Sequence, residues 1–294
     1  MKSLALVAMA VTVVLPAAAC ADDVRRVVDA SPDGLVSISN TAGAVEVSGW
    51  SRDQVEVIAE LGSGVEELVV ERDGGEVRIR VRAPRNRGRG IASDLTVRVP
   101  ENSSLNVSGV SADITVDDVQ GAQRLHSVSG DIETEAYATD VDAETVSGDI
   151  TILGDGKPMR TSATSVSGDI ELASLAGEIK AGSVSGDIAI VRGTLERTAL
   201  NTTSGDMVFH AELLDNGRLD VETINGDIEI EFVGIPSARF DIETFNGDIR
   251  NCFGPKAVRT SRYAPGYELS FTEGSGSGRV IIRTLNGDLR LCHD

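Results

Sequence analysis

Nine aspartates recur at nearly equal intervals in this chain, and their carboxylates are the groups in it best placed to do chemistry. Each follows a glycine, or once an alanine, in a motif of the form Ser/Thr-x-Ser/Asn-Gly-Asp-apolar. Oxygen-rich sets of carboxylates bind Ca²⁺, so an aligned column of them is a candidate calcium site. The alternative is that each aspartate hydrogen-bonds the local backbone and fixes a turn. The aspartates are Asp113, Asp131, Asp149, Asp169, Asp187, Asp206, Asp227, Asp248 and Asp288.

The glycines of the motif define a repeat. The first copy has Ala112 instead, and the steps between copies are 18, 18, 20, 18, 19, 21, 21 and 40 residues. Further glycines, such as Gly177, fall nine residues from the motif glycines and divide the unit into two halves. We expect a turn at each motif glycine, because only glycine adopts positive φ at little steric cost. These glycines are Gly130, Gly148, Gly168, Gly186, Gly205, Gly226, Gly247 and Gly287.

Polar and apolar residues alternate around each motif glycine. Counting the glycine as zero, offsets −2, +2 and +4 are mostly apolar, while −3, −1, +1 and +3 are mostly polar. Alternation with a period of two indicates a β-strand with one buried face. If it continues through the glycine, the Ser/Thr, Ser/Asn and Asp positions form one outward polar stripe. Such a stripe is a candidate docking face, or only a solvated sheet surface.

These elements predict an all-β chain: a single-chain parallel β-solenoid (β-helix) of about nine coils of 18–21 residues. One strand cannot bury its apolar face alone, whereas stacked coils can. At about 4.8 Å per coil, nine coils span about 43 Å. Aligned aspartates would then repel their neighbours by about 0.9 kcal/mol per pair even in bulk water, so something must offset the repulsion. The general crossover preference predicts a right-handed solenoid.

Three segments are expected along the chain. Residues 1–20 have the charged start, apolar run and small-residue end of a signal peptide. Residues 24–100 are less regular strands and are expected to be an N-terminal cap, within which 40–45 resemble a degenerate repeat. Residues 101–294 form the solenoid, with a loop insertion near 253–276 that accounts for the 40-residue step.

If the chain is exported, its three cysteines are candidates for lipidation or for a disulfide. Cys20 ends a segment that resembles a lipobox, so it is a candidate lipidation site; cleavage at a plain small-residue site, without lipid, is the alternative. Cys252 and Cys292 both lie five residues after a motif glycine. If the intervening segment bulges outward, their coils become neighbours and a disulfide follows.

Composition and motifs argue against several functions. The net charge of −19 repels nucleic acid and anionic lipid headgroups. The acids form a regular column rather than a singular cleft, and His126, His210 and His293 share no metal-ligand spacing. Nucleophile-elbow, phosphate-loop and C-x-x-C motifs are missing from the sequence. We therefore expect no enzyme and no cofactor, with Ca²⁺ as the one exception to test.

The Ser-Gly-Asp-Ile units, the lead-in strand at residues 95–100 and the signal peptide together resemble a bacterial "putative adhesin" family of unknown function. The resemblance covers about residues 30–294. It implies a β-solenoid at the cell envelope and assigns no catalytic residue.

Three functions remain in view. The first is a non-catalytic exported protein of the periplasm, outer envelope or cell surface, with an adhesin-like or structural role and a protein or glycan partner. The second is a module that binds Ca²⁺ or a peptide in envelope stress. The third, which the motifs disfavour, is a glycan-active β-helix enzyme.

Overall fold

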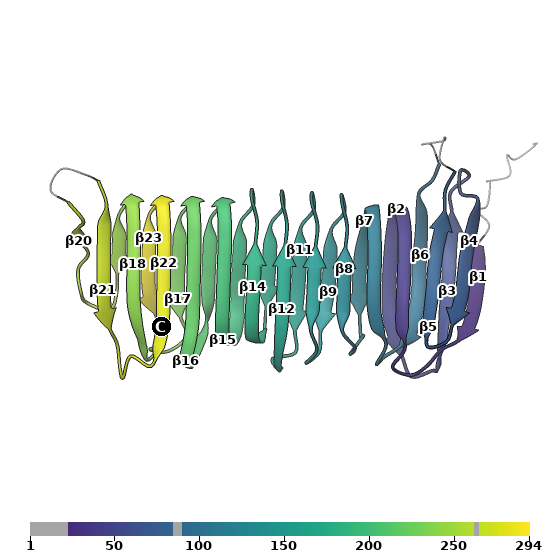
Figure 1. Ribbon diagram of the computed structural model, residues 1–294, viewed down its shortest axis with the longest axis horizontal. Coiled ribbons are helices and arrows are strands. Elements are labelled where there is room, and N and C mark those ends of the chain that lie inside the picture. Colours follow the sequence, from purple (N-terminus) through teal and green to yellow (C-terminus); the bar gives the residue numbers. More distant parts are fainter. Residues whose placement is uncertain (1–22, 85–89, 262–264) are drawn as a thin grey trace, which may run out of the picture.

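A computed structural model describes residues 23–84, 90–261 and 265–294. The molecule is elongated, and its 23 strands run across the long axis in one connected hydrogen-bonded network (Figure 1). The described residues form strands and no helix. Among them, therefore, no helical segment has the length and apolar character to cross a membrane. Residues 1–20, predicted to be a signal peptide, lie outside the described residues, and so does Cys20.

The repeats form the middle of the molecule, where every strand pairs in parallel with the strand one repeat away. Ile150, for example, lies between Ile132 and Ile170. The strands are β7 (Ser104–Asp117), β8 (Gln123–His126), β9 (Ile132–Ala136), β10 (Val141–Glu144), β11 (Ile150–Gly154), β12 (Pro158–Thr164), β13 (Ile170–Ala173), β14 (Ala176–Gly182), β15 (Ile188–Ser204), β16 (Met207–Asn225) and β17 (Ile228–Phe232).

Each coil contributes to two sheets that enclose one apolar core. Strands before a motif glycine, such as β8, β10, β12 and β14, pair with one another and form what we call the leading sheet. Strands after it, such as β9, β11 and β13, form the trailing sheet. The long strands β7, β15 and β16 contribute to both sheets. Inward side chains of both sheets belong to a single hydrophobic cluster that runs the length of the molecule.

The N-terminal strands do not stack in chain order. They are β1 (Asp23–Asp29), β2 (Leu35–Trp50), β3 (Gln54–Leu61), β4 (Glu67–Asp73), β5 (Glu76–Arg82) and β6 (Ser93–Pro100). The long strand β2 lies between β7 on one side and β5 with β6 on the other, parallel to all three. Gly43 in β2 is opposite Ala112 in β7, so β2 occupies the place of a preceding coil.

The C-terminal strands show the same change of order. They are β18 (Ala238–Asn246), β19 (Ile249–Asn251), β20 (Val258–Arg259), β21 (Tyr267–Thr272), β22 (Gly278–Asn286) and β23 (Leu289–His293). The last strands, β22 and β23, insert between β16/β17 and β18/β19, and Figure 1 shows them in yellow among green neighbours. The segment expected as a loop near 253–276 is not a loop throughout, because β21 in it pairs antiparallel with β18.

The all-β class is therefore confirmed, but a purely parallel sheet is not. Antiparallel pairs occur at both ends: β1–β3, β3–β6 and β4–β5 at the N-terminal end, and β18–β21 and β20–β21 at the C-terminal end. The physical reason is edge protection. A coil at the end of the stack exposes unpaired backbone groups and core, and an antiparallel return of the chain covers them with a short connection.

Phenylalanines fill the core at the C-terminal end. Five of the six in the chain are in mutual contact there: Phe209, Phe232, Phe240, Phe253 and Phe271. The rings of Phe240 and Phe271 stack with centroids 4.4 Å apart, which attaches β21 to the coil beneath it.

Candidate functional site

The repeated motif forms one long edge of the molecule, where the chain passes from the leading to the trailing sheet. The predicted alternation holds after the glycine, since offsets +2 and +4, as in Ile170 and Leu172, are buried. Before the glycine it is inverted. Ser127 at offset −3 is fully buried, whereas Val128 at −2 is 38% exposed. The prediction that offset −3 belongs to an outward polar stripe was therefore wrong, and so was the prediction that offset −2 faces inward.

The inversion has a physical cause in the bend itself. The residues at −5 and −7, such as Leu125 and Gln123, face the core, so the alternation of the leading strand carries −3 inward as well. After the bend, the even offsets face inward instead. Most copies have an apolar residue at −5, which indicated that odd offsets face inward before the glycine. The sequence prediction did not use this signal.

Most members of the buried Ser/Thr column hydrogen-bond to the adjacent coil. Thr223 is the exception, because its Oγ1 is buried and has no hydrogen-bond partner among the described residues. Ser127 Oγ donates a hydrogen bond to the carbonyl of Ala112 at 3.0 Å, and Thr145 Oγ1 donates to that of Gly130 at 3.2 Å. The same bond recurs from Ser165, Ser183, Thr202, Thr244 and Thr284. Each of these hydroxyls satisfies a carbonyl that the bend leaves outside the strand ladders, as buried polar groups require.

The motif glycines are required for close approach of coils. A Cβ on Gly168 would lie 1.9 Å from the carbonyl oxygen of Gly148, and one on Gly130 would lie 2.2 Å from that of Ala112. Positive φ, the predicted reason, does not apply to the copies from Gly130 to Gly205; only Gly226, Gly247 and Gly287 have it, at 155–157°. Left-handed residues instead mark the opposite bend of the coil, such as Ser174 with φ of 56°.

The nine aspartates form a continuous hydrogen-bonded column, which we call the Asp ladder. The backbone N–H of every ladder aspartate except Asp113 donates to Oδ1 of the aspartate in the adjacent coil, at 2.7–3.1 Å. The order in space is 113, 131, 149, 169, 187, 206, 227, 288 and 248, which follows the insertion of the last coil. These bonds to N–H groups stabilise the carboxylates and offset their mutual repulsion. In the stack, the aspartate side chains thus serve as acceptors for hydrogen bonds from backbone N–H groups.

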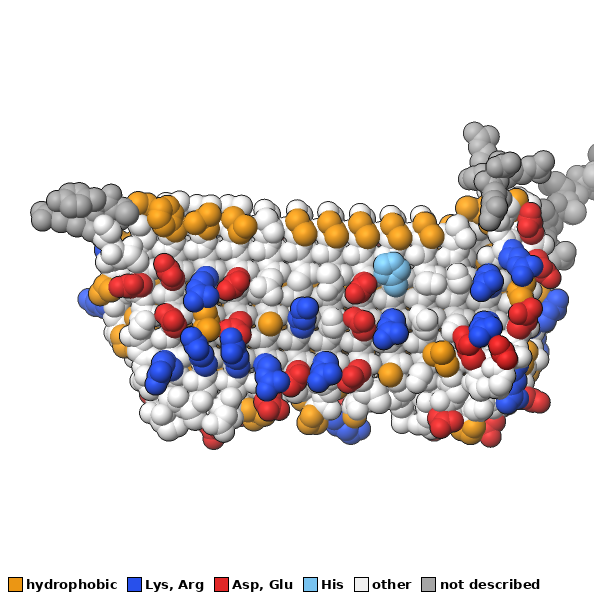
Figure 2. Space-filling model, viewed as in Figure 1, with side chains coloured by type: hydrophobic (Ala, Val, Ile, Leu, Met, Phe, Trp, Pro, Cys, Tyr) orange, Lys and Arg blue, Asp and Glu red, His pale blue; other side chains and the backbone are white. Residues whose placement is uncertain are grey.

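The exposed residues at offset −2 form a second column along the same edge, which we call the apolar ridge. Its members in spatial order are Val110, Val128, Val146, Val166, Val184, Ile224, Leu285 and Phe245, with Thr203 between Val184 and Ile224. They are 38–51% exposed. Figure 2 shows the ridge as an orange row along the upper edge, with one interruption. In each coil the ridge is three residues from the Asp ladder.

A shallow groove lies beside the C-terminal part of the ridge. Ile224, Leu285 and Phe245 line it together with the charged side chains of Glu222, Glu243 and Arg283. Here the largest ridge side chains and the groove coincide, so this part of the edge offers the most contact area to a partner.

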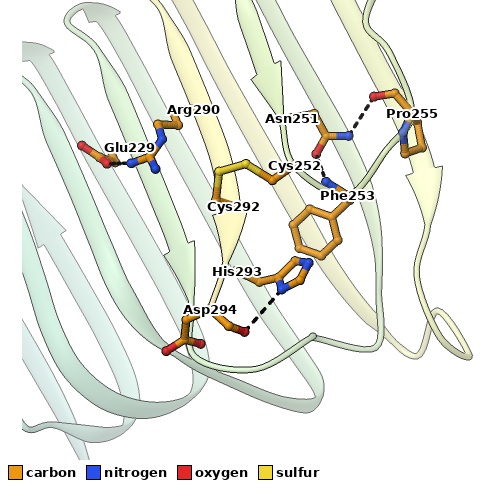
Figure 3. The surroundings of a disulfide bond; sticks show 9 residues. All are labelled: Glu229, Asn251, Cys252, Phe253, Pro255, Arg290, Cys292, His293 and Asp294. Carbon is orange, nitrogen blue, oxygen red and sulfur yellow. Dashed lines mark hydrogen bonds and ion pairs between the residues drawn. A yellow bond between two sulfur atoms is a disulfide. The ribbon is translucent and has the colours of Figure 1, made fainter.

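The two remaining cysteines lie at the C-terminal end, where β19 and β23 are neighbours. The structure joins Cys252 and Cys292 in a disulfide with a Cα–Cα distance of 4.9 Å (Figure 3). The Cys252 N–H also donates to the carbonyl of Leu291 at 2.9 Å. The ring of Phe253 contacts that of His293, with centroids 4.7 Å apart. The insertion of the last coil brings the cysteines together across 40 residues of sequence.

One buried carboxylate was not identified from the sequence. Glu56 in β3 is 2% exposed and forms ion pairs with Arg25 and Arg98. The hydrogen bond from Arg25 is the largest influence on the pKa of Glu56, and together with the charges of both arginines it outweighs burial and lowers that pKa. The group fastens β1 and β6 to β3, so its role is structural.

The arrangement as a whole is suited to binding. In the described parts of the chain, no three His, Cys, Asp or Glu side chains converge on a point where they could hold a metal. The Asp ladder supplies one carboxylate per coil. His126 lies near Glu144, with Nδ1 3.8 Å from Oε2, on the open leading sheet rather than in a cleft. What the motif edge does offer is a long, regular surface with an apolar and an acidic column.

Several solved structures resemble this chain over almost its whole length. A putative adhesin from Parabacteroides distasonis ATCC 8503 is 10% identical, covers 92% of this chain and 98% of its own, and has a TM-score of 0.48. A putative adhesin from Bacteroides fragilis NCTC 9343 is also 10% identical, with coverages of 92% and 96% and a TM-score of 0.46. A putative lipid binding protein from P. distasonis is 14% identical, with coverages of 92% and 98% and a TM-score of 0.44. No curated protein matches the chain.

A family model accounts for most of the sequence. The match runs from residue 35 to residue 291 and so includes β2, all the motif repeats and the inserted last coil. By that match, this chain belongs to the Toastrack DUF4097 family.

Proposed function

We propose that this chain is a non-catalytic, exported cell-envelope protein with an adhesin-like role. In this proposal, the repeats form a parallel β-solenoid between mixed β caps, and the solenoid is a rigid rod that presents the apolar ridge to a protein or glycan partner at the cell surface. The signal-peptide pattern of residues 1–20 supports export, and Cys20 would supply a lipid anchor if it is acylated. A disulfide between Cys252 and Cys292 fits an oxidising compartment.

The apolar ridge carries the proposal. Soluble proteins seldom leave large apolar side chains in one contiguous row, and such rows mark interaction sites. Eight exposed apolar residues share this edge, and each comes from the same offset of the motif. A surface that repeats with the coil can contact an extended partner along much of its length.

The test is adhesion of the purified protein to whole cells of the producing bacterium. The variant Val146→Ser/Val166→Ser removes two central ridge side chains. Because both are exposed, its thermal unfolding should match that of the parent, while its adhesion should fall several-fold.

The control variant is Leu153→Ser/Val208→Ser, which removes two apolar side chains of similar exposure, 44% and 38%, from the trailing sheet. It should adhere like the parent. Equal adhesion of the ridge variant and the parent would overturn the proposal, as would equal loss in both variants.

The Asp ladder supports a second candidate function, calcium binding. Every ladder carboxylate except that of Asp248 uses Oδ1 for the adjacent coil, and no hydrogen bond within the described residues occupies Oδ2 in the ladder. Oxygen atoms of this kind, one coil apart, are ligands that Ca²⁺ accepts. The check is a thermal melt in millimolar CaCl₂ against NaCl of the same ionic strength. A higher Tm in calcium supports this candidate, and an unchanged Tm removes it.

A further inference from the structure

Four arginines lie side by side on the leading sheet, far from the motif in each coil. Arg197 is paired in register with Arg218, Arg218 with Arg279, and Arg279 with Arg239, so β15, β16, β22 and β18 each contribute one. We call these four residues the arginine row. All four side chains are exposed. Figure 2 shows blue side chains gathered there, at the lower edge of the face whose upper edge is the apolar ridge.

The row departs from the charge pattern of the rest of its sheet. Between the other parallel strands of the leading sheet, charged residues that face one another have opposite signs: Arg124 is opposite Asp142, and Arg283 lies between Glu222 and Glu243. Opposite charges across strands are favourable, and like charges directly opposite one another are destabilising. Three successive Arg–Arg neighbours therefore cost stability, which the alternating positions of the same sheet avoid.

Only two of the four arginines in the row have an acidic partner that offsets their positive charge. Arg197 pairs with Glu178 at 2.5 Å, and Arg218 pairs with Asp220 at 2.5 Å. Within the described residues, Arg239 and Arg279 have no ion pair and no side-chain hydrogen bond. These two unpaired guanidinium groups face each other in register and form a local patch of positive charge. The chain as a whole is acidic, with a net charge of −19.

We propose that the arginine row binds an anionic polysaccharide, a chain whose carboxylate, sulfate or phosphate groups recur along its length. Guanidinium groups bind such oxyanions in bidentate geometry. The strand spacing places four of them about 4.8 Å apart along the long axis of a rigid sheet, so a linear polymer can meet several at once. This surface is separate from the apolar ridge and does not depend on it.

A nucleic acid fits the row less well. The overall charge of −19 opposes a polyanion of such charge density, and the row contains no aromatic side chain on which a base could stack. A polysaccharide with spaced charges meets the local positive patch with less repulsion from the remainder of the surface.

The experiment measures binding of the full chain to labelled hyaluronate and to polygalacturonate by fluorescence anisotropy, with neutral dextran for comparison. The variant Arg239→Gln/Arg279→Gln removes the two unpaired arginines. Loss of two charge-assisted contacts should raise Kd at least roughly tenfold and flatten its dependence on salt. Both residues are exposed, so the unfolding temperature should not fall.

The matched control is Arg283→Gln/Arg250→Gln, which changes net charge by the same amount. Arg283 is on the same strand and face as Arg279 but is paired with Glu222, and Arg250 is in β19 on the trailing sheet. Its Kd should stay within about twofold of the parent's, since neither residue belongs to the row. Equal weakening by both variants would mean that only overall charge matters and would overturn the proposal.

Two further probes separate other sources of anionic groups. A single-stranded oligonucleotide and vesicles containing an anionic phospholipid should bind more weakly than the acidic polysaccharides. Tighter, row-dependent binding of either one would replace the polysaccharide as the ligand. Failure of the parent to bind any acidic polysaccharide at low ionic strength would also refute the proposal, whatever the outcome of the adhesion test on the ridge.

Discussion

At each motif glycine, the backbone of one coil lies against the carbonyl of the coil before it. The space for a side chain is missing at Gly130, Gly148, Gly168, Gly186 and Gly205, whose φ values are not left-handed. Glycine is thus required at these positions because the coils are so closely spaced there. The same contact brings the buried hydroxyl at offset −3 within reach of the glycine carbonyl, so the glycine and the Ser/Thr column depend on each other.

Gly168→Ala should destabilise the protein. Its Cβ would lie 1.9 Å from the Gly148 carbonyl oxygen, so the coils must separate, and we expect a loss of about 2–3 kcal/mol in the free energy of unfolding. Denaturant unfolding measures it. Gly75→Ala is the control, because a Cβ there meets no atom within 4 Å, and it should change stability by less than about 0.5 kcal/mol. Equal effects would mean that the coils are not in contact at this column.

The ion pairs of Glu56 lead us to expect a specific dependence of the free energy of unfolding on pH. Its folded-state pKa is lowered below its ordinary value of 4.5, chiefly by the hydrogen bond from Arg25. A depressed pKa contributes stability that is present above the unfolded-state pKa and is lost as pH falls through the folded-state value. Glu56→Gln should therefore be less stable than the parent at pH 7, and the difference should shrink as pH falls below 4.5.

Denaturant unfolding at a series of pH values measures this difference. Glu60→Gln, which changes an exposed glutamate in the same strand, should have the parent's stability at pH 7. A difference between Glu56→Gln and the parent that stayed constant from pH 7 to pH 3 would mean that the ion pairs with Arg25 and Arg98 do not hold in solution.

Among the elements, the strands at the two ends of the molecule determine its order. At the N-terminal end, β2 lies between strands that follow it in sequence; at the C-terminal end, β22 and β23 lie between strands that precede them. At both ends, then, a coil distant in sequence is held between two others, and the outermost strands are left to antiparallel partners. At the C-terminal end this arrangement places the last strands, β22 and β23, inside the stack rather than at its edge, where fraying would otherwise begin.

The Cys252–Cys292 pair should stabilise the C-terminal arrangement. A disulfide that closes 40 residues restricts the unfolded chain, and the chain-entropy model gives about 4 kcal/mol as an upper figure. Replacing both cysteines with serine should lower the free energy of unfolding by about 2–4 kcal/mol. Non-reducing mass spectrometry of the protein, purified without reductant, checks the bond directly, and two free thiols would show that the coils are held without it.

For the molecule as a whole, the excess of negative charge is the main electrostatic feature. The chain has a net charge of −19, and its nine ladder aspartates share one edge. Self-repulsion of this kind opposes the compact state, even though every ladder carboxylate except that of Asp248 accepts a hydrogen bond from the adjacent coil. The exposed ion pairs, such as Arg160 with Glu178, contribute little and do not reverse the balance.

Added salt should therefore stabilise the protein. Raising NaCl from 20 to 500 mM shortens the Debye length from about 20 Å to about 4 Å, which weakens repulsion along the Asp ladder. Tm should therefore rise by a few degrees, on the order expected for roughly 1 kcal/mol. Differential scanning calorimetry measures it. A fall in Tm over the same range would mean that the surface ion pairs, rather than the net charge, dominate the electrostatics.

The sequence by itself determined the strand class, the length of the unit and the residues that share a column. These follow from local rules: a period of two indicates strands, and a repeated step of 18–21 residues indicates that equivalent positions stack. The Asp column could be read in this way without a structure, although its hydrogen bonds could not. The closeness of Cys252 and Cys292 was likewise an expectation from equal offsets in the repeat.

Only the tertiary structure decided the order of the coils, the covering of the ends and the phase of burial before each glycine. A sequence repeat shows which segments have the same place in a coil, but it does not show which coils are neighbours in space. The insertion of β22 between β16 and β18 therefore has no local signal in the sequence. The arginine row depends on that order for its register, and the apolar ridge depends on a bend that exchanges the inward and outward faces. Both surfaces arise because packing of whole coils, rather than local strand preference, sets which side chains reach solvent.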